Sequence, residues 1–327
     1  MDFNGKTIVI TGGAGFIGSN LAFYIQENFP QARIIVFDCF RNNQMFESGN
    51  PTSLGHFKNL LGFNGEIITG NINEAKDLAL LEKIDFDVMY HHAAISDTTV
   101  MDQKLVMQTN HQAFLLLLDM CLRKGAKMIY ASSAGTYGNT AAPNCIGKNE
   151  KPENVYGFSK LMMDMSVRKL LEKDPKLPIV GLRFFNVYGE REFYKGKTAS
   201  MVLQLGLQAL RDKKVKLFEF GEQKRDFVYI KDVVQANILA ANAKKGGIYN
   251  VGSGTARSYN DIIKILAHCL GHFEVEYIKN PYKFFQTHTQ ADLTEIKQDL
   301  NYSPEYDLEI GIKNYLDEIK RIFEETK

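Results

Sequence analysis

Three residues in the middle of the chain have types and a spacing suited to acid–base chemistry on a hydroxyl group. Tyr156 and Lys160 lie four positions apart, so on a helix both side chains share one face. An ammonium beside a phenol favours the phenolate, and we expect Lys160 to lower the pKa of Tyr156 toward neutral pH. Ser133 would hold the substrate oxygen. Taken alone, the Tyr-Lys spacing also fits an ordinary pair on a helix surface.

A glycine-rich segment near the N-terminus predicts a dinucleotide site. Gly12 and Gly15 follow an expected strand at 7–11, and Gly18 lies in the first turn of an expected helix at 16–26. Glycine lets the backbone approach a pyrophosphate, and the following helix offers free N–H groups and a positive dipole end. A plain glycine-rich turn has the same composition, but the strand before it and the helix after it favour a binding site.

Two charged residues after the second expected strand give opposite indications about the cofactor. Asp38 ends that strand about 20 residues past the glycines, where an acid bonds the adenosine ribose and disfavours NADP. Arg41 lies three residues further on and could bind the 2′-phosphate of NADP, or be a solvated loop residue. From these two residues alone, NAD and NADP both stay possible.

The elements that position these residues alternate between short apolar runs and helical patterns. Strands are expected at 7–11, 33–38, 66–69, 87–91, 127–131 and 179–185, with helices at 16–26, 105–124 and 156–171. This alternation predicts an α/β fold with a Rossmann-type, doubly wound parallel sheet and helices on both faces. Ser132 and Ser133 would follow the fifth strand and face the ligand crevice at the carboxyl edge of the sheet.

The pattern changes in the second half, which predicts a smaller, mixed α/β C-terminal substrate domain. Helices are expected at 198–211, 232–243, 258–270 and 308–325, and strands at 215–218, 227–230, 247–251 and 274–278. Ser258 is expected to cap the helix that begins there. Residues 1–186 and 226–254 are assigned to an NAD(P)-binding Rossmann domain, and 187–225 and 255–327 to a substrate-binding domain.

Composition excludes several classes of protein. The 327 residues are 45% hydrophobic and 24% charged, with a formal net charge of +1, as in ordinary globular domains. No clustered basic face suits nucleic acid, and no apolar run is long enough to span a membrane. The four cysteines form no CxxC pair, and His91 and His92 would point to opposite faces of a strand. We therefore expect a cytoplasmic protein with no metal site and no nucleic-acid or membrane partner.

The chain resembles, essentially end to end, the extended short-chain dehydrogenases/reductases that act on nucleotide sugars. The resemblance rests on the GxxGxxG spacing, on the Ser-Tyr-Lys set, and on the segments 183–189 and 225–229. It implies that Asn186 contacts the substrate and that Arg225 meets the nucleotide diphosphate.

Within that family the chain most resembles the ADP-glyceromanno-heptose 6-epimerases. The segments 186–200, 218–219 and 289–293 carry this resemblance. It implies inversion of C6 through a transient ketone, with an ADP-heptose substrate that supplies the lipopolysaccharide core of a Gram-negative bacterium. It also implies NADP as cofactor, with NAD possible, and a homo-oligomer. Lys195 would be a second catalytic base beside Tyr156, Lys160 and Ser133.

The same resemblance names further binding residues. In addition to the three glycines and Arg41, the cofactor would contact Phe16, Ile17, Asp38, His92, Ala93, Ala94, Ile95, Ser96, Asn110, Lys160 and Val187. The substrate would contact Asn186, Phe218, Glu219, Arg225 and Phe285. Lys197 and Gln204, which stand where the family usually has serine and histidine, are added to the substrate residues. These two departures, and Glu190 in place of a usual proline, affect the sugar contacts more than the chemistry.

Two alternatives stay open at this point. One is another nucleotide-sugar enzyme of the same family, a hexose 4-epimerase or a dehydrogenase. The other is a non-catalytic dinucleotide sensor, although such sensors tend to lose the tyrosine or the lysine, and both are present here. Dehydration is not expected, because Ala134 and Gly135 stand where 4,6-dehydratases carry an acid pair.

Overall fold

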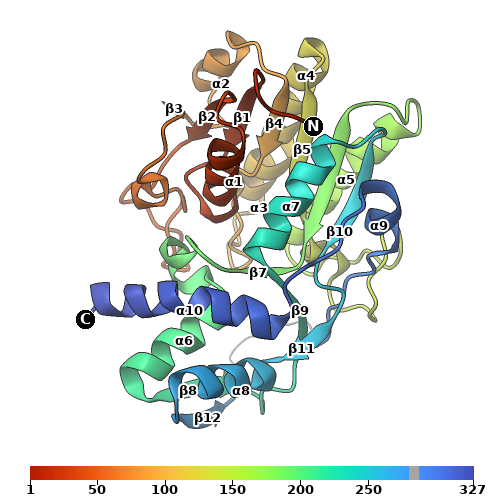
Figure 1. The fold of residues 1–327 in the computed structure, drawn as a ribbon. Helices are drawn as coiled ribbons and strands as arrows, with labels where there is room; N and C mark the ends of the chain where they lie inside the picture. The colour runs from red at the N-terminus through yellow and green to blue at the C-terminus, as the bar shows by residue number, and fades with distance from the viewer. Residues whose placement is uncertain (280–286) are drawn as a thin grey trace.

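The structure, a computed structural model, describes residues 1–279 and 287–327 (Figure 1). A seven-stranded parallel sheet forms its core, in the order β10-β6-β5-β4-β1-β2-β3. The strands are β1 (Thr7–Thr11), β2 (Arg33–Asp38), β3 (Glu66–Thr69), β4 (Val88–His91), β5 (Lys127–Ser133), β6 (Ile179–Phe184) and β10 (Gly247–Val251). The order reverses between β1 and β4, and ligands of such sheets bind beyond the carboxyl ends at this point.

Helices cover both faces of the sheet, because alternate strand residues point to opposite sides. Ile8 and Ile10 of β1 belong to the core beneath α1 (Phe16–Asn28) and α7 (Ile230–Ala241). Val9 belongs to the opposite core, beneath α2 (Ala75–Glu82), α4 (Ala113–Lys124) and α5 (Val155–Leu171). The predicted doubly wound Rossmann-type sheet is confirmed.

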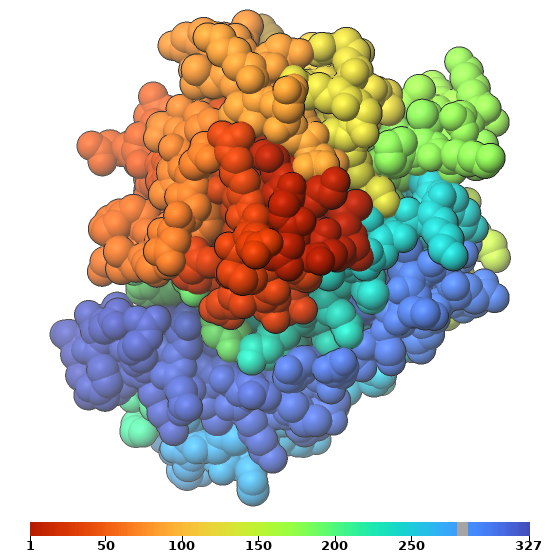
Figure 2. All heavy atoms as spheres, turned by 45° about the horizontal axis from the view of Figure 1, so that its top comes forward, coloured from red at the N-terminus to blue at the C-terminus, as the bar shows by residue number. Residues whose placement is uncertain are grey.

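A second part lies below the sheet in Figure 1. Its helices α6 (Met201–Asp212), α8 (Tyr259–Leu270) and α10 (Leu308–Glu325) pack on one another, beside the parallel pair β8 (Lys214–Phe218) and β12 (Glu274–Ile278). The sheet of β7 (Asn186–Tyr188), β9 (Lys224–Tyr229) and β11 (Ala256–Ser258) lies between this part and the first. In Figure 2 the N-terminal segment, red to orange, lies directly over the blue C-terminal one.

Several local features differ from the predicted elements. The helix expected at 105–124 is interrupted, because α3 (Gln103–Met107) is followed by a π-helical turn (Gln108–Gln112) before α4 begins. Strand β5 runs through Ser133, so both serines are its last residues and do not follow it. Helix α9 (Thr294–Leu300) packs on β10 and α7, although the predicted boundaries put it in the substrate domain.

Helix α8 begins with the cap that the sequence predicts. Ser258 caps α8: its hydroxyl accepts the Asp261 N–H, and the Asp261 carboxylate accepts the Ser258 N–H at 2.9 Å. This capping box satisfies two backbone donors that the helix itself cannot. Within residues 1–279 and 287–327, no helix combines the length and the apolar character needed to cross a membrane.

Candidate active site

A cavity of about 320 Å³ opens at the carboxyl edge of the parallel sheet. It brings together many of the residues that the sequence singled out, from both halves of the chain. These are Gly12, Gly15, Phe16, Ile17, Gly18, Asp38, His92, Ala93, Ala94, Ile95, Ser96, Ser133, Tyr156, Lys160, Val187 and Lys195.

The cavity also has walls that sequence reasoning missed. Gly70, Asn71 and Ile72 directly follow β3. The rule that placed Asp38 at the sheet edge would also have found them, since ligand crevices form beyond strand ends. The segment 52–55 lines the cavity as well, but it returns from a long irregular loop and carries no sequence signal.

The three glycines of the GxxGxxG segment have different roles. Gly12 has a φ of +70°, and a Cβ there would lie 2.6 Å from the Ala93 nitrogen. A Cβ on Gly18 would lie 2.4 Å from the Gly12 oxygen, so the chain's own packing requires both glycines. A Cβ on Gly15 would meet only the Gly12 oxygen, at 3.2 Å, and otherwise open space. No side chain caps α1 after Gly15, which leaves the cradle suited to a pyrophosphate.

The sequence suggested that Asp38 and Arg41 both face the cofactor, but in the structure only Asp38 of these two lines the cavity. The carboxylate of Asp38 accepts the N–H groups of Ala14, at 3.0 Å, and Phe40, at 2.8 Å, while burial raises its pKa. Arg41 is not among the residues that line the cavity. Its guanidinium donates to the main-chain oxygen of Tyr194, which directs it toward the loop after β7.

Ser133, Tyr156 and Lys160 line the same cavity, but their electrostatics differ from the prediction. Lys160 donates from Nζ to the Ala131 oxygen at 2.7 Å, and burial lowers its pKa to about 8 against the influence of Asp164. Burial raises the pKa of Tyr156, and the hydrogen bond with Ser133 only partly opposes this. The predicted lowering of the tyrosine pKa by Lys160 is therefore wrong for this structure, because desolvation dominates.

A buried carboxylate beneath these residues was missed in the sequence. Asp164 lies one helical turn beyond Lys160 and is fully buried. It accepts hydrogen bonds from the Tyr130 hydroxyl at 2.8 Å, the Ser132 hydroxyl at 2.9 Å and Nε of Arg183 at 2.7 Å. The network ties α5 to β5 and β6 directly below Ser133. The four-residue spacing from Lys160 was the available signal.

Asn110 acts behind the cavity wall. Its carboxamide accepts the Ile95 N–H at 2.8 Å and donates to the Ile95 oxygen at 2.9 Å and to Ser159 Oγ at 3.0 Å. It lies in the π-helical turn that interrupts the predicted helix. Asn110 therefore holds the segment that includes Ile95 against α5.

Lys195 reaches the same cavity from the opposite side. It lies in the loop 189–200 that follows β7, within a short helix (Phe193–Thr198). Its Nζ lies 5.3 Å from the centre of the Phe16 ring. Burial lowers the pKa of Lys195, and the carboxylate of Glu192 opposes this. The structure thus places two titratable groups, Tyr156 and Lys195, on one cavity.

Among the described residues, those predicted to contact substrate do not line this cavity. Asn186 and Lys197 are exposed, and Gln204 donates to the main-chain oxygens of Lys197 and Ala199. Arg225 is buried and donates to the Lys224 oxygen at 2.9 Å. Phe218 and Glu219 lie at the end of β8. Phe285 lies outside the described residues.

The histidines are not arranged as a metal site. His91 shares a hydrogen bond of 2.8 Å with the Thr11 hydroxyl, whereas His92 lines the cavity. In the described part of the chain, no group of three His, Cys, Asp or Glu side chains could hold a metal ion.

Comparisons with known proteins agree with this geometry. Residues 8–252 match the model of the NAD dependent epimerase/dehydratase family. A protein of Brachyspira hyodysenteriae named ADP-L-glycero-D-manno-heptose-6-epimerase is 34% identical over 323 residues, which cover 96% of this chain and 98% of the relative. One of Alkalilimnicola ehrlichii with the same name is 35% identical, with coverages of 95% and 97%.

Solved structures agree as well. The crystal structure of Helicobacter pylori ADP-L-glycero-D-manno-heptose-6-epimerase is 60% identical, with a TM-score of 0.91 over 98% of both chains. UDP-glucose 4-epimerase of Thermotoga maritima, solved with UDP-glucose, is 28% identical, with a TM-score of 0.85 over 97% of this chain and 99% of that one. The match over most of the length, together with the glycine cradle and the Ser-Tyr-Lys set, means that this chain belongs to the NAD dependent epimerase/dehydratase family.

Proposed function

We propose that the chain is an ADP-glyceromanno-heptose 6-epimerase, an isomerase that inverts C6 by transient oxidation and reduction. The observation that carries this proposal is the approach of two titratable side chains, Tyr156 and Lys195, to one cavity from different elements. The names of the relatives with 34% to 60% identity support the choice of substrate.

The cavity fits a nicotinamide dinucleotide. The open side of Gly15 and the N-terminus of α1 would hold the pyrophosphate, and the end of β2 at Asp38 would lie at the adenosine ribose. When bound, this cofactor supplies reversible hydride transfer.

The chain's own residues would move the proton. In one epimer, Ser133 holds the sugar oxygen while Tyr156 takes or returns its proton. In the other epimer the oxygen lies elsewhere, because the carbon must present its opposite face. Tyr156 cannot reach both places within hydrogen-bond distance. Lys195 serves the second position from the loop after β7.

We assign NADP as the preferred cofactor, with NAD accepted. Family resemblance supports this preference, and so does the state of Asp38. Both of its oxygens already accept backbone N–H groups, which weakens its repulsion of a 2′-phosphate. Titration of the cofactor-free enzyme with NAD and NADP tests the assignment. A large preference for NAD would overturn it.

The sugar nucleotide would extend from the cavity toward the second part of the chain. By resemblance, its contacts would be Asn186, Lys197, Gln204, Phe218, Glu219, Arg225 and Phe285. The division into Rossmann and substrate domains, the cytoplasmic location and the homo-oligomer belong to the same proposal. Light scattering after gel filtration tests the oligomer, since a monomer at micromolar concentration would contradict it.

A panel of sugar nucleotides tests the function itself. The purified enzyme should convert either C6 epimer of ADP-glyceromanno-heptose into the same equilibrium mixture, with no added cofactor and no net change in nicotinamide absorbance. Mass spectrometry of the denatured protein should identify the cofactor that copurifies. Conversion of UDP-glucose to its C4 epimer, with the heptoses untouched, would make the chain a hexose 4-epimerase instead.

A further inference from the structure

A single buried carboxylate joins the two ends of the loop that carries Lys195. Glu192 is 0% exposed. Its Oε1 accepts the Gly189 N–H at 3.1 Å and the Ser200 hydroxyl at 2.7 Å, and its Oε2 accepts the Ser200 N–H at 2.6 Å. Gly189 follows β7 and Ser200 caps α6, so these bonds close the loop at its base.

We propose that Glu192 is a positioning residue for Lys195: it fixes the loop that aims the lysine into the cavity and supplies the counter-charge for its ammonium. The inference deepens the proposed function and rests on it.

The backbone of Lys195 is held on both sides. Its N–H donates to the main-chain oxygen of Glu192 at 2.9 Å, and its own oxygen accepts the Thr198 hydroxyl at 2.9 Å. Glu192 thus contributes its carboxylate to the base of the loop and its carbonyl to the turn that presents the lysine. Because the loop is constrained in this way, the Lys195 side chain is already placed in the cavity before the reaction. Such positioning lowers the activation barrier.

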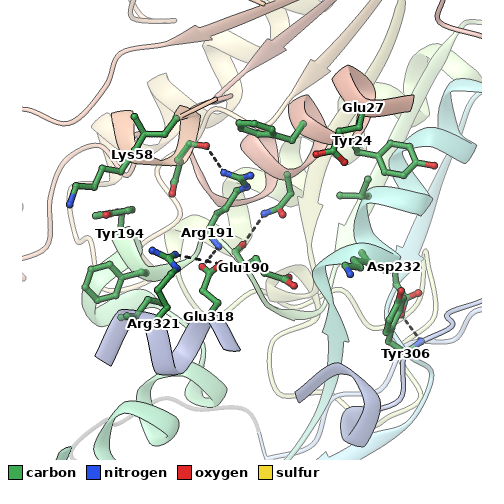
Figure 3. Close-up of a pocket in the computed structure, with 18 of the residues that line it drawn as sticks. Tyr24, Glu27, Lys58, Glu190, Arg191, Tyr194, Asp232, Tyr306, Glu318 and Arg321 are labelled. Atoms are coloured by element: carbon green, nitrogen blue, oxygen red, sulfur yellow. Dashed lines mark hydrogen bonds and ion pairs between the residues drawn. The ribbon is translucent and has the colours of Figure 1, made fainter. Parts of the chain in front are cut away.

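The opposite side of the loop faces a second, larger groove between α1 and α10, where a different carboxylate supports it. Figure 3 shows Arg191 between these helices, with Glu318 and Arg321 of α10 directed toward it. Glu318 accepts the Arg191 N–H at 2.8 Å, and Arg191 donates to the Asn59 oxygen at 3.0 Å. Glu318 therefore also bonds the loop backbone, but from the side away from the cavity.

The two carboxylates differ in the charges they face. Glu192 interacts electrostatically with Lys195, and it also interacts with the buried Tyr315 hydroxyl of α10. Arg191, Arg321 and Glu190 lie beside Glu318. Burial lowers the pKa of Lys195. Of the two carboxylates, Glu192 and not Glu318 opposes this by raising it. Loss of the charge at Glu192 should therefore discharge Lys195 at lower pH, whereas loss of the charge at Glu318 should not.

The test compares Glu192→Gln with the matched control Glu318→Gln in the full-length, cofactor-loaded enzyme. The first readout is the pH dependence with which acetic anhydride modifies Lys195, followed by mass spectrometry, with the exposed Lys264 as internal reference. The second is the epimerase kcat and KM. We expect Glu192→Gln to move the titration of Lys195 to lower pH. Its kcat should fall roughly tenfold to a hundredfold, with KM little changed.

The control, Glu318→Gln, should leave the titration of Lys195 and kcat near those of the parent enzyme. Should Glu192→Gln fail to fold, Glu192→Asp keeps the charge and should keep the Lys195 titration while lowering kcat. An unshifted Lys195 titration in Glu192→Gln, or equal shifts in both glutamine variants, would overturn the inference. The labelling does not depend on turnover, so it stands apart from failure of the proposed function, which an active Lys195→Met enzyme would reveal.

Discussion

Lys160 donates its Nζ hydrogen bond to the main-chain oxygen of Ala131, within the strand that ends at Ser133. The ammonium is thus anchored on β5, beneath the hydroxyl groups that would handle the substrate oxygen. Its pKa is lowered to about 8, because the lowering by burial exceeds the raising by the nearby Asp164 carboxylate. The charge of Lys160 is therefore present below about pH 8 and is lost as the pH rises through that value.

We predict that kcat/KM falls on the alkaline side with an apparent pKa near 8. Discharge of Lys160 removes a positive charge from the cavity that Tyr156 also lines, and burial raises the pKa of the tyrosine, so higher pH does not compensate by ionising it. The pH profile of kcat/KM measures this, since it reports groups of the free enzyme. Samples held at pH 9 and assayed at pH 7.5 control for irreversible loss. A profile that stays flat to pH 9.5 would exclude this role for the lysine charge.

Substitution of Gly15 should separate cofactor binding from folding. Gly15→Val places its side chain toward the open cavity, so we expect a near-normal melting temperature and no copurifying nicotinamide. Gly18→Ala is the contrasting variant, because its Cβ would lie 2.4 Å from the Gly12 oxygen and should destabilise the fold. Melting curves and cofactor mass spectrometry read the two effects. A Gly15→Val protein with full cofactor content would refute the assignment of the loop.

Strong local sequence patterns predicted most of the fold. They predicted the residues of the site only where these lie at the ends of strands. Strands β1, β2, β3, β10 and β12 and helix α10 have the predicted bounds, because each is a clear apolar run or amphipathic repeat. Short elements such as β7 and β11 were not predicted, since three residues carry too little pattern.

The sequence did not predict how burial changes the properties of the site residues. The spacing of Tyr156 and Lys160 predicted their proximity, but not that desolvation would raise the pKa of the tyrosine. Arg41 was placed near the cofactor by its distance along the chain, yet the loop after β7 binds its guanidinium through the Tyr194 oxygen. Both outcomes depend on segments far apart in the sequence that pack together only in the fold.

Asp226 should be important for stability. It is fully buried, and its carboxylate accepts four bonds, from the Ser253 N–H and hydroxyl and from the N–H groups of Gly254 and Ala291. Asp226→Asn would set an NH₂ group against two of these donors and lower the free energy of unfolding by about 2–4 kcal/mol. Urea denaturation measures the change. Asp307→Asn is the control, because asparagine caps a helix as well as aspartate does, and equal losses in both would contradict the prediction.

The enzyme should not dehydrate hexose nucleotides. Ala134 and Gly135 directly follow Ser133, and neither side chain can transfer a proton to a leaving hydroxyl. Incubation with UDP-glucose and dTDP-glucose should give no 4-keto-6-deoxy sugar when the products are analysed by mass spectrometry. Any such product from the purified protein would show that another group supplies the acid.

The variants Lys195→Met and Tyr156→Phe decide between epimerase and simple dehydrogenase chemistry. Each removes one proposed proton-transfer group from the cavity and leaves the glycine segment unchanged. We expect each to lower kcat for epimerisation roughly 10²–10⁴-fold, while cofactor content and substrate affinity stay near those of the parent enzyme. If Lys195 merely bound a phosphate, Lys195→Met would instead raise KM and keep kcat, because a lost ground-state contact weakens binding without slowing the chemical step. That pattern would leave Tyr156 as the only base and would refute the two-base mechanism.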